Sequence, residues 1–190
     1  MSVVGSILET TTKGNTLHVL QWIAVEADDE DTATQKVETR LEEELNPGFS
    51  WFDWFIVGGG RWNKDQDQYK ASSNMVISYD RDPNAFRGKV DELITSRIAT
   101  YNEYLAEVKK HDVIAKLDNY GGVMEYDHVF YYLRSVVKMK SGDWTFDSEF
   151  YDLEAYSSNA THLLSRLDKH DLDTPKNVTG IFLVPVDFHF

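Results

Sequence analysis

The segment from Trp51 to Trp62 concentrates residue types that can hold an anionic ligand. It reads WFDWFIVGGGRW, and its adjacent glycines are Gly58, Gly59 and Gly60. Glycine adopts positive φ readily, so this bend can bring backbone N–H groups close to a ligand. The guanidinium of Arg61 is a planar fork that suits phosphate or carboxylate. The indole rings of Trp51, Trp54 and Trp62 offer faces on which a nucleobase can stack.

This segment matches neither of the standard nucleotide-binding loops. No Gly-Lys-Ser/Thr follows it, as a P-loop requires, and adjacent glycines lack the spacing of a dinucleotide-binding fingerprint. Two interpretations remain. In the first, Arg61 and the loop amides hold an anionic group while aromatic residues stack a base. In the second, the bend is a glycine-rich strand exit whose tryptophans anchor the core.

The C-terminal residues Asp187-Phe188-His189 form a second candidate site. Residues two apart on a strand point to one face, so the carboxylate and the imidazole should project together. Such a pair can orient a general base, ligate a metal or hydrogen-bond a polar ligand, or it can be a plain ion pair at a strand end. His18 would approach this pair if the first and last strands are neighbours, which would complete a plausible metal set. We nevertheless expect no resident metal or cofactor.

Hydrophobic patterning predicts the elements that position these residues. Apolar or alternating runs predict strands at Leu17–Val25, Phe49–Val57, Met75–Tyr79, Val129–Met139, Trp144–Phe150 and Val178–His189. Capping residues and helical spacing predict helices after Asp28–Asp31, after Asp82-Pro83 and after Ser157 or Ser158. Ser141-Gly142 should form a hairpin turn, and Pro185 should mark an edge position or a bulge.

The order of these elements predicts one α+β domain over residues 1–190. We set aside residues 63–122 as an insertion that carries a strand and a helical segment. What remains is the β-α-β-β-α-β pattern of a ferredoxin-like sandwich. In that topology the first and last strands lie in one sheet, with the helices on one face.

The composition is strongly acidic and lacks cysteine. The chain has 190 residues with 32 acidic and 19 basic side chains, a formal net charge of −13. The absence of cysteine excludes disulfide scaffolds, cysteine-ligated metals and thiol nucleophiles. Glu26–Glu44 carries nine acidic and two basic side chains, and Asp143–Glu154 carries five acidic and no basic ones. These windows argue against binding of duplex nucleic acid. They are either solvated faces that maintain solubility or an acidic surface that mimics nucleic acid.

The sequence also indicates where the protein works. No apolar run is long enough for a membrane span, and the N-terminus lacks the basic region of a signal peptide. We therefore expect a cytoplasmic protein without membrane contact. Self-association into a homo-oligomer is left open.

Three features together resemble a family of small bacteriophage-encoded proteins with no assigned activity. They are an opening strand followed by Glu-Ala-Asp-Asp and a helix, the Asp-Trp-Phe-Ile-Val-Gly-Gly-Gly-Arg-Trp run, and a Gly-Asp-Trp hairpin with a terminal Asp-Phe-His. The family shows Asp-Trp/Tyr-x-x-Gly-Gly-Arg-Trp, a Gly-x-Trp hairpin and a closing Asp-x-His, and this chain departs from it by a third glycine. The matching positions are Asp53, Trp54, Gly58, Gly59, Gly60, Arg61, Trp62, Trp144, Asp187 and His189. The resemblance implies that the protein is encoded by a phage, lies in the cytoplasm of the bacterial host and has a role directed at the host.

Three functions are consistent with these observations. We expect first a binding protein whose matching positions hold an anionic small molecule or nucleotide, sequestering an immune signal of the host as an anti-defence protein. The first alternative is an acidic protein–protein inhibitor or nucleic-acid mimic that targets a host defence enzyme. The second alternative is a small metal-assisted phosphodiester hydrolase built on His18, Asp187 and His189. Binding without turnover is the expectation that we favour.

Overall fold

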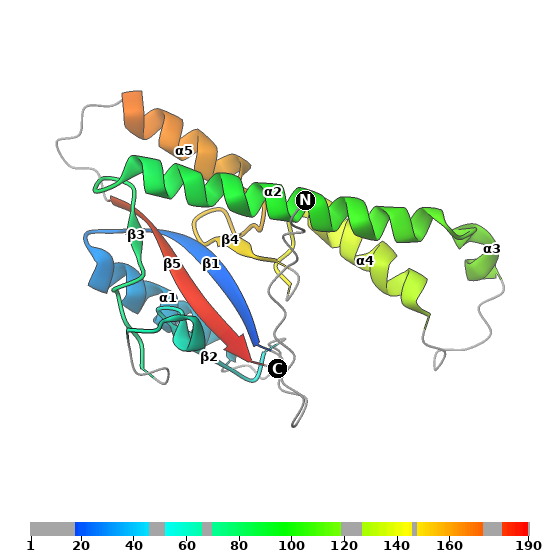
Figure 1. Ribbon diagram of the computed structural model, residues 1–190, viewed down its shortest axis with the longest axis horizontal. Helices are drawn as coiled ribbons and strands as arrows, with labels where there is room; N and C mark the ends of the chain where they lie inside the picture. Colours follow the sequence, from blue (N-terminus) through cyan, green and yellow to red (C-terminus); the bar gives the residue numbers. More distant parts are fainter. Residues whose placement is uncertain are drawn as a thin grey trace.

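A computed structural model describes most of the chain. The described residues are 18–45, 52–65, 70–118, 127–145, 148–172 and 180–189. Within them the chain forms a mixed α/β fold, with a five-stranded mixed sheet and five α-helices (Figure 1). This confirms the coarse prediction of a fold that combines helices with a sheet. Among the described helices, none combines the length and apolarity that a membrane span needs.

The first and last strands are neighbours in the centre of the sheet. The strands are β1 (His18–Ala27), β2 (Trp54–Val57), β3 (Ile77–Ser78), β4 (Phe150–Asp152) and β5 (Gly180–His189). Their order is β2-β5-β1-β4, and β3 pairs with β5 beyond the end of β2. β5 runs antiparallel to β1, β2 and β3, whereas β4 runs parallel to β1. The prediction that the first and last strands lie in one sheet is confirmed, and the pairing of β1 with β5 meets the condition set for the approach of His18. The strand expected at Trp144–Phe150 begins only at Phe150.

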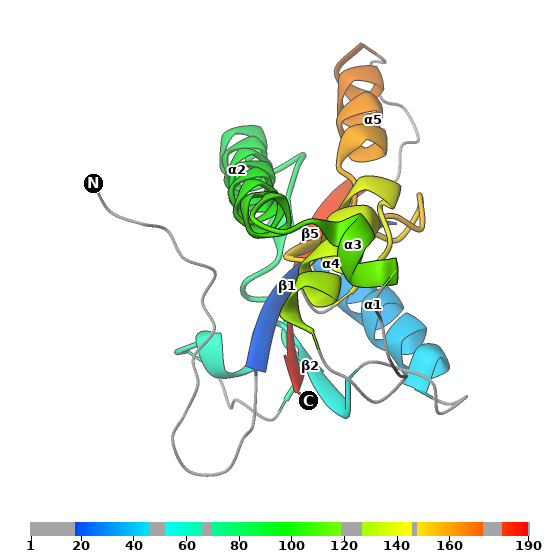
Figure 2. The same cartoon turned by 90° about the vertical axis from the view of Figure 1, so that its right-hand side faces the viewer.

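Helices cover both faces of the sheet, not one face as predicted. They are α1 (Glu30–Leu45), α2 (Pro83–Lys109), α3 (Val113–Asp118), α4 (His128–Ser141) and α5 (Thr161–Leu172). α1 packs on the face that includes Ile23 and Val25, whereas α2 and α5 pack on the face that includes Trp22 and Ala24. Figure 2 shows α1 and α2 on opposite sides of the two central strands. The reason is that β1 is apolar at successive positions, so both of its faces need a cover.

The predicted strand Val129–Met139 is instead part of α4. The side chain of Asp127 accepts a hydrogen bond from the Val129 N–H at 2.8 Å and caps the first turn. Ser141-Gly142 ends this helix, with Gly142 at a φ of 80°, and forms no hairpin turn. The segment is rich in β-branched and aromatic residues, which favour strands. Here it packs against α2 instead, so tertiary contact overrides the local preference. The second half of α2 projects beyond the sheet together with α3 and α4 (Figure 1).

Pro185 lies in a central strand, which corrects the expectation of an edge or a bulge. It pairs with Trp22, and its carbonyl accepts a hydrogen bond from the Gly58 N–H at 2.7 Å. The N and O atoms of one strand residue point to the same side. The missing N–H of Pro185 therefore faces the edge of β5 that pairs with β2 and β3. On that edge β2 pairs with β5 only as far as Val186, and β3 pairs only with Phe182 and Leu183. The proline is tolerated because the described strands leave a gap at this point.

Candidate functional site

Strand register brings two histidines and a tryptophan into one row across β2, β5 and β1. His189 lies opposite both Trp54 and His18, at the end of the sheet where β5 ends (marked C in Figure 1). The Trp54 indole stacks on the His189 ring with a centroid distance of 4.6 Å and an interplanar angle of 13°. The His18 and His189 ring centroids are 5.1 Å apart. The row therefore places two imidazoles and one indole in mutual contact.

Asp187 lies beneath this row and fixes the orientation of His18. Its side chain is buried, with Oδ1 2.9 Å from His18 Nδ1, while Oδ2 accepts a hydrogen bond from the Arg61 N–H at 3.1 Å. Burial raises the pKa of the Asp187 carboxyl above its ordinary value, and the hydrogen bonds from His18 and the Arg61 amide oppose this shift. An ionised Asp187 holds the imidazole proton on Nδ1 and leaves the lone pair of His18 on Nε2.

The glycine bend packs tightly under this cluster. Gly58, Gly59 and Gly60 have φ values of 97°, 93° and 47°, in the left-handed region that favours glycine. A Cβ on Gly60 would lie 2.5 Å from Asp187 Oδ2, so this position also needs glycine for the close approach of the backbone. A short 3₁₀ turn, Gly60–Trp62, then presents the Arg61 amide to Asp187.

Three backbone amides at the bend donate hydrogen bonds inside the protein. The Gly58 N–H donates to Pro185 O at 2.7 Å, and the Arg61 N–H donates to Asp187. The Trp62 N–H donates to Gly59 O at 2.9 Å. These three amides are therefore not donors for a bound anion, which would be held mainly by side chains.

Two buried side-chain nitrogens at this site have no hydrogen-bond partner. They are Arg61 Nη1 and His189 Nδ1. The side chain of Asp53 is exposed, and one of its carboxylate oxygens lies 3.6 Å from His189 Nδ1. Burial raises the pKa of Asp187, and the positive charge of Arg61 and the contact with His18 oppose that rise. Buried polar groups without partners are rare in folded proteins, and each one calls for an explanation. A bound ligand that supplies acceptors is such an explanation.

We call this cluster the imidazole–arginine site. Its members are His18, Trp54, Arg61, Trp62, Asp187 and His189. The structure thus brings together most of the residues predicted from sequence, with Asp53 at the rim and the three glycines as support. His18 is added by strand register, and its ring centroid is 6.3 Å from that of Trp62. Trp51 lies outside the described residues.

Trp144 is not part of this site. Its Nε1 donates a hydrogen bond to Gln21 Oε1 at 2.6 Å, and its ring stacks on Tyr151 with a centroid distance of 4.5 Å. It also contacts Phe188, whose side chain points to the face of β5 opposite to that of Asp187. Trp144 therefore packs against the core on the α1 side of the sheet.

In the described part of the chain, no group of three metal-ligating side chains is placed to hold a metal ion. The set of His18, Asp187 and His189, considered as metal ligands from the sequence, does not form one. Asp187 instead accepts hydrogen bonds from His18 and from the Arg61 amide. The chemistry of this site is accordingly derived from its imidazoles, carboxylate and guanidinium.

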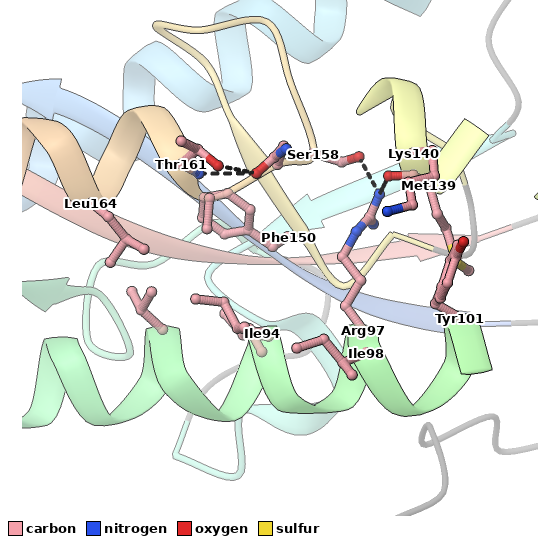
Figure 3. A pocket seen from close by; sticks show the side chains of 14 residues that line it. Ile94, Arg97, Ile98, Tyr101, Met139, Lys140, Phe150, Ser158, Thr161 and Leu164 are labelled. Atoms are coloured by element: carbon pink, nitrogen blue, oxygen red, sulfur yellow. Dashed lines mark hydrogen bonds between the residues drawn. The ribbon is translucent and has the colours of Figure 1, made fainter. Parts of the chain in front are cut away.

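A separate apolar cavity of about 350 Å³ lies between α2, α4, β4 and the start of α5 (Figure 3). Leu93, Ile94, Phe150 and Leu164 form much of its lining. Arg97 spans its wall, because its Nη2 donates to Met139 O at 3.0 Å and to Ser158 Oγ at 2.9 Å. The cavity shares no lining residue with the imidazole–arginine site. Sequence reasoning missed it because one wall is α4, which was predicted to be a strand.

Comparison with known proteins gives no match: no protein-family model, no curated protein and no solved structure is significantly similar to this chain.

Proposed function

We propose that the protein binds a small anionic ligand of the nucleotide class at the imidazole–arginine site. The observation that carries this proposal is the pair of buried nitrogens without a hydrogen-bond partner, Arg61 Nη1 and His189 Nδ1, within one ring-lined cluster. The nearest carboxylate oxygen to His189 Nδ1 belongs to the exposed Asp53, 3.6 Å away. The guanidinium is permanently charged, and leaving a buried charged donor without a partner costs more than about 1–3 kcal/mol. A phosphate oxygen is an acceptor of the kind that this guanidinium lacks.

The aromatic residues support a ligand that also carries a ring. Trp54 is 36% exposed, although one side of its indole stacks on His189. Stacking of a nucleobase on an aromatic side chain contributes about 1–3 kcal/mol per base. Trp62 lies across His18 and adds a second indole at the same site. A phosphate at Arg61 with a base on an indole is the combination that a nucleotide offers.

The acidity of the chain favours a small ligand over a long polyanion. The net charge of −13 opposes the approach of any anion, but salt screens charges beyond roughly 8 Å at physiological ionic strength. Arg61 contacts Asp187 on the face of β5 opposite to the one that α1 covers, so the sheet separates a small anion at Arg61 from the acidic side chains of α1. A long nucleic acid would extend over them and be repelled.

We also keep two finer expectations as proposals. The antiparallel β1–β5 pair and the parallel β1–β4 pair support a ferredoxin-like topology for this part of the sheet. The pairing of β2 with β5 and the helices on both faces depart from it. The resemblance to bacteriophage proteins supports a role in which the bound nucleotide is a signal of the host that the protein sequesters.

Isothermal titration calorimetry tests the binding proposal. The probes are cyclic 3′,5′-linked di-adenylate, ADP-ribose, inorganic phosphate and adenosine, so that phosphate and base contributions separate. We expect micromolar binding of a nucleotide probe, and weakening of roughly 10- to 150-fold in Arg61→Met, since a charged hydrogen bond contributes about 1.5–3 kcal/mol. Arg134→Met, which removes an exposed arginine of α4, is the matched control and should bind like wild type. Equal affinity of Arg61→Met and wild type would refute the site.

A further inference from the structure

We propose that the imidazole–arginine site cleaves short 3′,5′-linked oligoribonucleotides by transesterification, with His18 as general base and His189 as general acid. This inference rests on the proposed function, because cleavage requires a nucleotide bound at the same site. It goes further in assigning turnover, a substrate class and a role to each imidazole.

His18 has the arrangement of a general base. Its Nδ1 lies 2.9 Å from the buried Asp187 carboxylate, which is itself held by the Arg61 amide. These contacts hold the carboxylate in place, and when Asp187 is ionised the basic lone pair of the ring is on Nε2. A histidine oriented by a carboxylate through one nitrogen and acting through the other is a recurring device for proton abstraction.

His189 is placed to supply the second proton transfer. It lies directly across the strand pair from His18, with an interplanar angle of 71° and ring centroids 5.1 Å apart. Trp54 packs flat on its ring and restrains its rotation. This separation allows both imidazoles to reach oxygens of one phosphodiester group. The two rings thus provide one base and one acid at a single substrate position.

The reaction is balanced without any further reactant. His18 Nε2 takes the proton of the ribose 2′-OH, and the 2′ oxygen forms a bond to the adjacent phosphorus. The bond from phosphorus to the 5′ oxygen breaks, and His189, as imidazolium, donates a proton to that oxygen. The products are a 2′,3′-cyclic phosphate and a 5′-OH, and exchange with solvent restores both imidazoles. Arg61 stabilises the extra negative charge on the phosphorane.

This chemistry defines the substrate class. The 2′-OH is the nucleophile, so ribonucleotide linkages are substrates and deoxyribonucleotide linkages are not. The acidic windows of the chain exclude long polyanions for the reason given above. Short linear or cyclic oligoribonucleotides with 3′,5′ linkages meet both conditions.

The test uses the full chain in the presence of EDTA. The substrates are the set of linear ribodinucleoside monophosphates together with the cyclic 3′,5′-linked di-adenylate and di-guanylate. Mass spectrometry should detect 2′,3′-cyclic phosphate products from at least one of them. The 2′-O-methyl counterpart of that substrate should bind in calorimetry with similar affinity and remain intact.

Histidine variants then assign the two roles. His18→Gln and His189→Gln should each lower kcat by about 10²- to 10⁴-fold, and each should remove one limb of a bell-shaped pH profile. The matched control is His170→Gln, which removes another histidine–aspartate contact, 3.1 Å from Asp80, and should leave kcat unchanged. Thermal melting monitors folding, and if one variant fails to fold, the other variant and the wild-type pH profile still decide the assignment.

Each outcome is decisive. Binding of the 2′-O-methyl analogue without cleavage of any ribonucleotide overturns this inference and leaves the proposed binding function standing. Absence of binding overturns both proposals. Cleavage that appears only after a divalent metal is added, or that survives in both His18→Gln and His189→Gln, overturns the assignment of the imidazoles.

Discussion

Replacement of Gly60 by alanine should destabilise the protein and disable the site. Gly60 has a φ of 47°, and an L-residue in that region costs roughly 1–2 kcal/mol. The new Cβ would lie 2.5 Å from Asp187 Oδ2 and 2.6 Å from its Cβ. Asp187 is 1% exposed and held by His18 and the Arg61 amide, so it can move only by breaking those contacts. Overpacking of this kind costs about 1–3 kcal/mol.

The two contributions predict a loss of about 2–5 kcal/mol in the free energy of unfolding. Urea denaturation monitored by circular dichroism and tryptophan fluorescence measures it directly. Gly88→Ala is the matched control, because a Cβ at Gly88, within α2, meets nothing within 4 Å. The free energy of unfolding of Gly88→Ala should be about 0.5–1 kcal/mol higher than that of the wild type, because alanine is more favourable than glycine inside a helix.

The second measurement concerns the ligand. Gly60→Ala displaces Asp187 and the Arg61 amide together, so nucleotide affinity should fall along with stability. The reasoning is refuted if the free energy of unfolding of Gly60→Ala lies within about 0.5 kcal/mol of the wild-type value, which is the range of ordinary surface substitutions. It is refuted equally if Gly88→Ala loses as much stability as Gly60→Ala does.

The other predictions concern contacts away from the site. Arg166→Met should lower the free energy of unfolding by about 3–5 kcal/mol in urea denaturation, because it leaves the fully buried Asp152 without its two guanidinium bonds of 3.0 and 2.8 Å. Hydrogen bonds from Tyr79 and Arg87 lower the pKa of Asp171 below 3.8, so the folded chain binds fewer protons there than the unfolded chain. Its contribution to stability is present above that value and is lost as the pH falls through the lowered pKa. Tyr79→Phe should therefore flatten the acid limb of a stability–pH curve, and an unchanged limb would contradict this. Trp144→Phe should lower the free energy of unfolding by about 1–3 kcal/mol, because the indole hydrogen bond to Gln21 is lost. Nucleotide binding, measured by calorimetry, should not change. Weakened binding would show that Trp144 belongs to the site.

Local patterns were sufficient to predict the two longest strands, three of the helices and the shared face of Asp187 and His189, whereas the carboxylate of Asp187 pairs with His18 and not with His189. Those features follow from periodicity over a few residues, since alternate strand residues share a face and capping residues mark helix starts. The glycine bend was also visible in the sequence, because only glycine takes the backbone angles that follow β2. What these patterns cannot specify is which segments meet.

The tertiary structure decided the rest of the fold for that reason. The β-branched and aromatic residues of α4 favour a strand locally, whereas the segment is a helix that is capped by Asp127 and packs against α2. Trp144 resembles a site residue in the sequence, yet strand order and face place it on the opposite side of the sheet. The cavity beside Arg97 exists only once α2, α4 and α5 are assembled.

The imidazole–arginine site shows most clearly the difference between what the sequence determines and what the tertiary structure decides. The sequence by itself determined which side chains were available: an arginine after a glycine bend, an aspartate and a histidine two apart, and indoles beside them. The contact between His18 and Asp187 joins residues 169 positions apart, and the register of β1 against β5 alone decides it. A shift of that register by one residue would turn His18 to the other face. The pairing of strands, a property of the whole sheet, therefore converts separate residues into one imidazole–arginine site.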